Sequence, residues 1–264
     1  MPLVPAIEIQ NLVKTYDGSP AVDGLSLAVA GGEIVGLVGP NGAGKTTTLR
    51  CLAGILPPTS GRIAIAGHDL AADPVEARRQ LAFVPDEPRL FESLTVADHL
   101  KVVARIYGVL DGPERSRELL AQFDLADRAN AFPAELSRGM KQKLMIAAAL
   151  LHRPAALVLD EPLTGLDPGA IRRMKRTLLE QAASGTAVLV SSHLLALVQE
   201  ICGRVVIVQR GRTVLAGTLS EIRAALPDLG ADADLEEIFL RATEGPLAPA
   251  AAAGTPREDA ESGG

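Results

Sequence analysis

The chain has 264 residues, of which 47% are hydrophobic and 22% are charged, and its formal net charge is −6 at pH 7. These proportions are typical of a folded globular protein and exclude a fibrous or largely disordered chain. The acidic balance and the 3% aromatic content disfavour nucleic acid as a direct ligand, because such binding relies on clustered cations and stacking rings. No apolar run approaches the roughly 18 residues that span a bilayer, so the sequence predicts neither a secreted nor a membrane-spanning chain.

The first third of the chain is predicted to be rich in strands. Short apolar runs separated by turn-forming residues predict strands at 6–13, 21–30, 32–39, 62–67 and 81–84. A helix is predicted at 44–56, where apolar residues have helical spacing until two prolines end the pattern. This order places a glycine-rich segment between a strand and a helix.

The rest of the chain changes character twice. Helical periodicity predicts a helical subdomain from about 86 to 150, with helices at 97–110, 113–125 and 141–151. Beyond it, strands predicted at 156–160, 187–193 and 204–211 alternate with helices at 171–185 and 194–203, which is typical of a parallel sheet. The stretch 244–264 is rich in Ala, Pro, Gly and acidic residues, and we expect a disordered tail there.

The glycine-rich segment fits a phosphate-binding loop. Residues 39–46 match the pattern GxxxxGK[ST] between a predicted strand and helix, where backbone N–H groups and the helix dipole favour a triphosphate. Lys45 can reach the β- and γ-phosphates, and the Thr46 hydroxyl is placed to coordinate Mg²⁺. The alternative is an ordinary glycine-rich turn. The residues expected to bind nucleotide here are Gly39, Pro40, Asn41, Gly42, Ala43, Gly44, Lys45, Thr46 and Thr47.

Two acids end the apolar strand predicted at 156–160. Asp160 and Glu161 then lie at the carboxyl edge of the sheet, where alternation along the strand separates their side chains. We expect Asp160 to hold Mg²⁺ through its hydration shell and Glu161 to orient and deprotonate an attacking water. The alternative is that these acids only end the strand and are solvated there. The nearby phosphate-binding loop favours the functional role over this alternative.

A third motif distinguishes this chain from other proteins that have a phosphate-binding loop and a pair of acids. Residues 136–142, Leu-Ser-Arg-Gly-Met-Lys-Gln, resemble the signature sequence of ABC ATPases. Ser137 is a favourable helix N-cap, and Gly139 removes a side chain so that the phosphate of another molecule can approach. Alone, this segment would fit a capped surface helix equally well.

The resemblance, which covers about 6–243, implies an α/β fold: a P-loop NTPase with a RecA-like parallel sheet core, an N-terminal antiparallel β subdomain and an inserted α-helical subdomain. It also implies a head-to-tail dimer in which two ATP molecules lie between the phosphate loop of one chain and the signature of the other.

Further positions are similar to functional residues of the family, each with a plainer alternative. Tyr16 resembles the aromatic residue that stacks on adenine, or is a core aromatic at a strand end. Asp167, in a loop resembling one that contacts the partner cassette, would otherwise belong to a plain turn. His193 resembles the switch histidine that senses the γ-phosphate, although a lone His is more often structural.

Two positions depart from the usual pattern. Asp86 stands where the family usually has Gln, and its carboxylate can ligate Mg²⁺ but adds negative charge near the γ-phosphate. Met140 occupies the usual Gln position of the signature. Both departures, and a C-terminal helix expected at about 232–243, resemble the exporter branch whose membrane subunit is a separate six-helix protein.

The resemblance implies an ATPase that uses ATP and Mg²⁺ at the cytoplasmic face of the membrane to drive transport. Its expected partners are an integral-membrane permease subunit and a second ATP-binding subunit, expected to be another copy of the chain, with no nucleic acid. Two alternatives remain open: a soluble ABC protein acting on DNA or ribosomes, and a small-molecule kinase with a P-loop. The first usually carries insertions or a second cassette, and the second has no use for residues 136–142.

Overall fold

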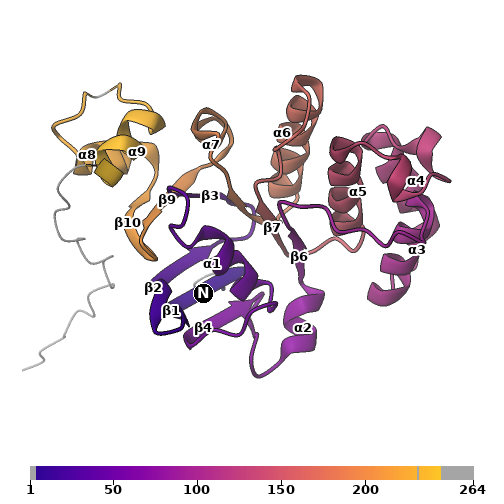
Figure 1. Ribbon diagram of the computed structural model, residues 1–264, viewed down its shortest axis with the longest axis horizontal. Helices are drawn as coiled ribbons and strands as arrows, with labels where there is room; N and C mark the ends of the chain where they lie inside the picture. Colours follow the sequence, from indigo (N-terminus) through magenta and orange to yellow (C-terminus); the bar gives the residue numbers. More distant parts are fainter. Residues whose placement is uncertain (1–3, 231, 245–264) are drawn as a thin grey trace, which may run out of the picture.

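The computed structural model describes residues 4–230 and 232–244 (Figure 1). The predicted tail at 244–264 lies outside the described residues, apart from Glu244 at the end of the last helix. Within the described ranges, no helix combines the length and apolar character needed to cross a bilayer.

A small antiparallel sheet is built by the N-terminal part of the chain. Its strand order is β2-β1-β4-β5, and all of its pairings are antiparallel. One face is apolar, because inward positions such as Ile7, Ile9 and Val29 alternate with more exposed ones. The strands are β1 (Ile7–Tyr16), β2 (Ser19–Val29), β4 (Ser60–Ile65) and β5 (His68–Asp69).

A six-stranded sheet forms the centre of the molecule, in the order β10-β9-β3-β8-β7-β6. The strands from β9 to β6 pair in parallel, whereas β10 is antiparallel to β9. Strands β3, β7 and β8 are buried along their whole length, as expected of a sheet covered on both faces. The strands are β3 (Ile34–Val38), β6 (Leu81–Val84), β7 (Ala156–Asp160), β8 (Ala187–Ser191), β9 (Arg204–Gln209) and β10 (Arg212–Gly217).

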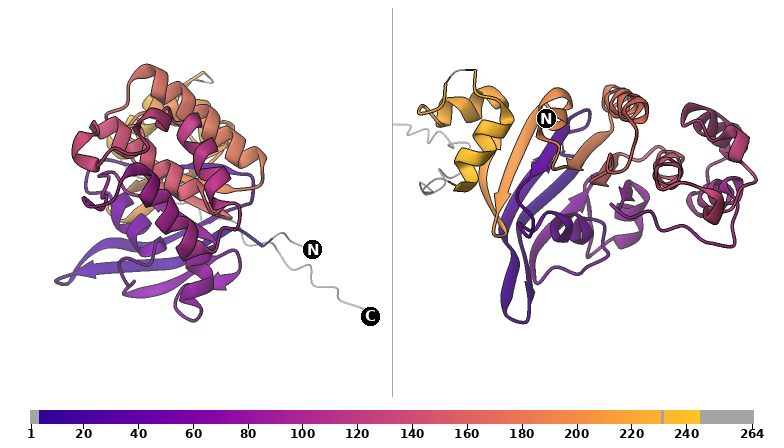
Figure 2. Two further views of the ribbon diagram at one scale, coloured as in Figure 1. Left: turned by 90° about the vertical axis from the view of Figure 1, so that its right-hand side faces the viewer. Right: turned by 45° about the horizontal axis from the view of Figure 1, so that its top comes forward.

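Helices cover both faces of the large sheet, and further helices lie at the two ends of the molecule. The apolar core between the two sheets includes residues of α1, while α6 and α7 pack on the opposite face of the large sheet. Figures 1 and 2 show α3, α4 and α5 together at one end of the molecule and α8 and α9 at the other. The helices are α1 (Lys45–Leu52), α2 (Pro74–Arg79), α3 (Val96–Tyr107), α4 (Gly112–Gln122), α5 (Arg138–Leu150), α6 (Pro168–Ala183), α7 (Leu195–Ile201), α8 (Leu219–Ala225) and α9 (Leu235–Glu244).

The predicted fold class is confirmed: an antiparallel sheet and an inserted group of helices accompany a central, mainly parallel sheet. Six short elements of the described residues were not predicted, namely α2, β5, β10, α8 and two 3-10 helices at Ala126–Arg128 and Pro133–Glu135. The predicted C-terminal helix at about 232–243 corresponds to α9, which begins three residues later. Residues between β6 and α3, which the prediction placed in the helical subdomain, form a loop.

His152 gives the stability of this fold a pH dependence. Its ring stacks on Tyr107 with 3.8 Å between ring centroids, and burial lowers the pKa of His152 to about 4. In the unfolded chain the same imidazole titrates near its ordinary value of about 6.5. Between these two values the unfolded state binds the additional proton, so the free energy of unfolding should fall as the pH falls from about 6.5 to 4.

We expect this loss to be about 1–2 kcal/mol, because the ring is only partly shielded from solvent. Urea unfolding of the wild-type chain and of His152→Leu at several pH values measures it. The variant should lose this part of the pH dependence, and equal pH profiles for the two chains would contradict the assignment.

Candidate nucleotide site

The loop between β3 and α1 is shaped by close backbone contacts. Gly44, the N-cap of α1, has a φ of 100°, a left-handed conformation that favours glycine. A Cβ on Gly44 would lie 2.3 Å from the Ala21 carbonyl oxygen, and a Cβ on Gly39 would lie 2.3 Å from the Val208 carbonyl oxygen. Both ends of the loop therefore require glycine. These two glycines allow the backbone to turn tightly before the first turn of α1.

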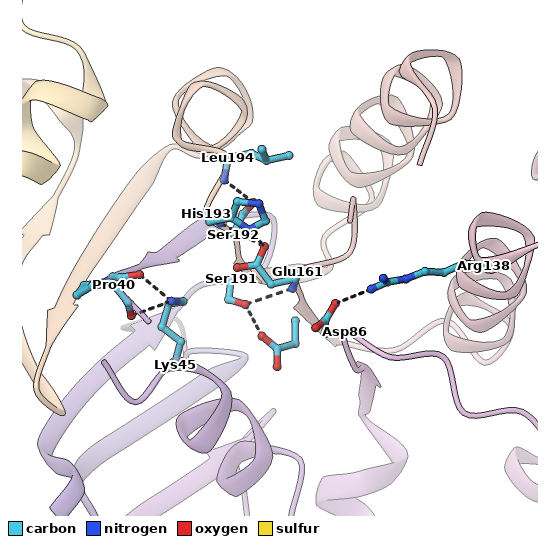
Figure 3. A network of polar contacts seen from close by, with 11 residues as sticks. Pro40, Lys45, Asp86, Arg138, Glu161, Ser191, Ser192, His193 and Leu194 are labelled. Carbon is cyan, nitrogen blue, oxygen red and sulfur yellow. Dashed lines mark hydrogen bonds and ion pairs between the residues drawn. The ribbon is translucent and has the colours of Figure 1, made fainter. Parts of the chain in front are cut away.

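Lys45 points back over this loop. Its ammonium group donates to the carbonyl oxygens of Gly39 (2.7 Å) and Pro40 (3.2 Å), as Figure 3 shows. Burial lowers the pKa of Lys45, whereas the nearby charges of Glu161 and Asp160 act in the opposite direction. Thr46 and Thr47 follow in the first turn of α1 and are half-buried. An anion placed here would meet a desolvated cation and the positive end of the helix dipole.

The two predicted acids leave the end of β7 in different directions. Asp160 is buried, and its Oδ1 accepts a hydrogen bond of 2.6 Å from the Ser191 hydroxyl. Glu161 has a φ of 48°, a left-handed conformation that costs an ordinary residue about 1–2 kcal/mol. Its N–H donates to the Ser191 carbonyl oxygen at 3.1 Å, which holds the turn.

The Glu161 carboxylate meets His193 on the neighbouring strand end. Its Oε2 accepts the backbone N–H of His193 at 3.2 Å and lies 2.7 Å from Nδ1 of the ring. An ionised carboxylate can only accept a hydrogen bond, so Nδ1 is the donor in this contact, and Nε2 of the exposed ring has no partner among the described residues. Asp160, bound to Ser191, and Glu161, bound to His193, thus lie at the carboxyl edge of the sheet, close enough for both charges to act on Lys45. Figure 3 shows Glu161 and His193 on the side of the phosphate loop where Lys45 lies.

The signature residues lie at the start of α5. Ser137 is the N-cap and accepts the Met140 N–H at 3.3 Å. A Cβ on Gly139 would lie 3.3 Å from the Gly165 carbonyl oxygen, so the loop before α6 packs closely on this turn. Asp167 caps α6 through Ala170, and this hydrogen bond lowers the pKa of Asp167. A cavity of about 350 Å³ is lined by Ser137, Arg138, Gly139, Met140, Lys143, Gly165, Leu166 and Asp167.

The signature and the phosphate loop lie apart within one chain. In Figure 3, Arg138 at the start of α5 is on the far side of the carboxylates from Lys45. Arg138 instead faces Asp86, with 3.5 Å between Nη2 and Oδ1. Both side chains are about half exposed, and such a pair contributes little stability. The two predicted nucleotide-contacting surfaces therefore do not meet in the single chain.

Tyr16 ends β1 and stands apart from these contacts. Its side chain is 45% exposed, and Lys14 Nζ lies 5.3 Å from the ring centroid. An exposed ring at a strand end can stack on a planar base, and it is not a core aromatic.

Oxygen donors in the site suit a hard cation. Mg²⁺ usually binds through one or two protein oxygens together with substrate phosphates and water, and Thr46 and Asp160 supply oxygens of this kind. Across residues 4–230 and 232–244 there is no cluster of three His, Cys, Asp or Glu side chains that could hold a metal by itself. The donor set therefore fits Mg²⁺ that arrives with a nucleotide.

Sequence reasoning missed two residues of the site. Ser191 contacts both acids, but nothing in the sequence pairs it with Asp160 until the strand order is known. Arg138 belongs to the signature segment, yet its contact with Asp86 depends on how α5 lies against the loop after β6.

Comparisons with known proteins identify the family of the chain. The family model described as "ABC transporter" matches residues 22–164. The chain is 37% identical over 240 residues to the ABC-type transporter ATP-binding protein EcsA of Bacillus subtilis, covering 90% of this chain and 96% of that protein. It is 36% identical to the daunorubicin/doxorubicin resistance ATP-binding protein DrrA of Streptomyces peucetius, covering 84% and 68% of the two chains.

Solved structures give the same result. An ATP-binding subunit of an ABC transporter is 38% identical and superposes with a TM-score of 0.86, covering 90% of this chain and 99% of that one. A bacterial ABC transporter cassette solved as a dimer is 25% identical with a TM-score of 0.75, covering 81% and 98%. The chain belongs to the ABC transporter ATP-binding family. It is the ATPase subunit of a transporter.

Proposed function

We propose that the chain powers export by binding and hydrolysing Mg-ATP in a dimer of two ATP-binding subunits at the cytoplasmic face of a membrane. The observation that carries this proposal is the meeting of Lys45, Asp160, Glu161 and His193 at one sheet edge, with the signature residues held away from them. Relatives that are named for resistance or export support the direction of transport.

Each residue has a definite role in this proposal. Lys45 and the backbone N–H groups of residues 41–47 hold the triphosphate, while Tyr16 stacks on adenine. Thr46 and Asp160 would hold Mg²⁺, with Asp86 as a third oxygen donor, and the metal would neutralise charge on the phosphates. Glu161 orients and deprotonates the attacking water. His193, fixed through Nδ1, turns Nε2 toward the γ-phosphate.

The second half of each nucleotide site comes from another copy of the chain. Ser137 and Gly139 present the start of α5 to a phosphate, and Asp167 lies in the same hollow. Because one chain keeps this hollow apart from its own Lys45, a head-to-tail pair of chains would complete two sites. Nucleotide binding would then close the pair, and hydrolysis would open it.

The helical end of the molecule is the proposed contact with the permease. A cavity of about 770 Å³ lies against α3 and α4, and its lining is mostly apolar, with Lys101, Arg105 and Arg117 among the lining residues. Leu110 in this lining is 99% exposed, and Ile106 on α3 is 72% exposed. Exposed apolar side chains around a hollow are typical of a surface that receives a partner helix.

Leu110→Asp is therefore expected to weaken binding of the membrane subunit about tenfold or more, because it buries a charge in an apolar contact. The measurement is the amount of integral-membrane protein recovered with the tagged chain from detergent-solubilised membranes. Ile55→Asp, at an apolar residue beyond α1 that is 58% exposed, is the control and should leave recovery unchanged. Equal recovery with both variants, or recovery of ribosomes or DNA in place of a membrane protein, would contradict the proposal.

A further inference from the structure

One buried hydroxyl lies between the two acids of the site. Ser191 is the last residue of β8 and stands beside Asp160, the last residue of β7, in the parallel register. Its side chain is fully buried. Its Oγ donates to Asp160 Oδ1 at 2.6 Å and accepts the Glu161 N–H at 3.3 Å. The same hydroxyl therefore contacts the carboxylate of one acid and the backbone of the other.

The contact with Asp160 fixes the rotation of its carboxylate. A distance of 2.6 Å is typical of a hydroxyl bound to an ionised carboxylate, which is a strong and directional interaction. Because Oδ1 is occupied by Ser191, the carboxylate is left with Oδ2 as its less engaged oxygen. A carboxylate that acts through the hydration shell of a metal contacts the water molecules bound to that metal. Because these waters have fixed positions around the metal, the carboxylate needs a fixed orientation to reach them.

The contact with Glu161 helps to hold an unfavourable backbone. Glu161 has a left-handed φ of 48°, and its N–H is directed at both the carbonyl and the hydroxyl oxygen of Ser191. The Glu161 side chain is held separately by His193, which follows Ser191 by two residues. The end of β8 thus supports both acids from one side.

We propose that Ser191 is a positioning residue that orients Asp160 for Mg²⁺ and steadies the backbone of Glu161. This inference rests on the proposed Mg-ATP site and adds a residue to it. The plain alternative is a buried hydroxyl that only satisfies its own hydrogen bonds, in which case its removal changes stability without changing the response to Mg²⁺.

The test is the affinity for a fluorescent, non-hydrolysable ATP analogue, measured in EDTA and then across a Mg²⁺ titration. Ser191→Ala is expected to bind the analogue in EDTA within twofold of wild type. It should need about tenfold more Mg²⁺ to reach half of the affinity gain, because outer contacts of metal ligands commonly change metal affinity by that factor or more. Steady-state phosphate release at saturating Mg²⁺ should also fall.

Matched variants separate positioning from folding. Ser192→Ala removes the neighbouring hydroxyl, which is equally buried but accepts only the Leu194 N–H among the contacts described, and should leave the Mg²⁺ requirement unchanged. Ser191→Thr keeps the hydroxyl and should restore the requirement, whereas Ser191→Cys keeps the volume with a weaker donor and should not. Thermal unfolding of each variant shows that it is folded.

A Mg²⁺ requirement of Ser191→Ala within twofold of wild type would overturn this inference. So would an equal rise in Ser192→Ala. A wild-type chain without any Mg²⁺-dependent gain in affinity would instead overturn the proposed function.

Discussion

Replacing Glu161 with Gln is expected to lower the rate of ATP hydrolysis by about 10²-fold or more while leaving nucleotide affinity nearly unchanged. The amide keeps the size of the side chain and one oxygen for His193, but it cannot take a proton from water. A loss of this size is the usual contribution of a general base. Phosphate release and equilibrium binding of ATP, measured on the same preparation, separate the two effects.

The matched control for this variant is Glu180→Gln. Glu180 lies on α6, is exposed, and pairs with Arg176 at 3.6 Å, so its neutralisation should change neither quantity. Turnover of Glu161→Gln close to that of the wild type would remove Glu161 from the proposed role.

The second large effect is expected from Ser137→Arg. This change places a long cation in the hollow at the start of α5, where the phosphate of the other chain's nucleotide is proposed to bind. Steady-state hydrolysis should fall by about 10²-fold, far beyond the roughly 1 kcal/mol that the lost N-cap costs in stability. A kinase with a P-loop would tolerate the change, since residues 136–142 would have no role in its reaction.

Thr218→Arg is the control for the cap itself. Thr218 caps α8 with the same type of hydrogen bond, to the Glu221 N–H, at the opposite end of the molecule from α3–α5. It should retain turnover. If both variants lose activity equally, the effect of Ser137→Arg comes from folding and not from the signature.

Mixing two inactive variants tests whether the sites are shared between chains. In a mixed pair of Lys45→Ala and Ser137→Arg chains, one site receives both defects, while the other combines an intact phosphate loop with an intact signature. Hydrolysis in the mixture should therefore exceed that of either variant alone. No recovery upon mixing would indicate that each chain works by itself.

Much of the fold followed from local patterns in the sequence. The buried strands around β3, β7 and β8 are continuous apolar runs, and the phosphate loop is fixed by glycines that the backbone requires at Gly39 and Gly44. The short elements were harder to predict from the sequence. Helix α2 has six residues and β5 has two, which is too few for a periodic pattern to be distinguished from a turn.

Some missed elements did carry a signal. Thr218 and Glu221 form a capping box at the start of α8, and a search for this spacing would have found the helix. Strand β10 follows a tight turn at Arg210 and Gly211, both with positive φ, and pairs back on β9 as a hairpin.

The site shows where sequence reasoning stops. The separate directions of Asp160 and Glu161 were predicted from strand alternation, but the structure adds the left-handed backbone at Glu161, which alternation does not describe. Ser191 and His193 reach these acids because β8 lies next to β7 in the sheet, although some thirty residues separate them along the chain. Contacts of this kind depend on strand order, which local patterns do not determine.

The central claim is that nucleotide is held between two copies of the chain. The most direct measurement is the molar mass of Glu161→Gln in solution, by light scattering or small-angle X-ray scattering, without nucleotide and with saturating Mg-ATP. The proposal predicts a single chain without nucleotide and a species of twice that mass with Mg-ATP, which Ser137→Arg in the same background should prevent. Single chains that bind Mg-ATP to saturation and stay monomeric would contradict it.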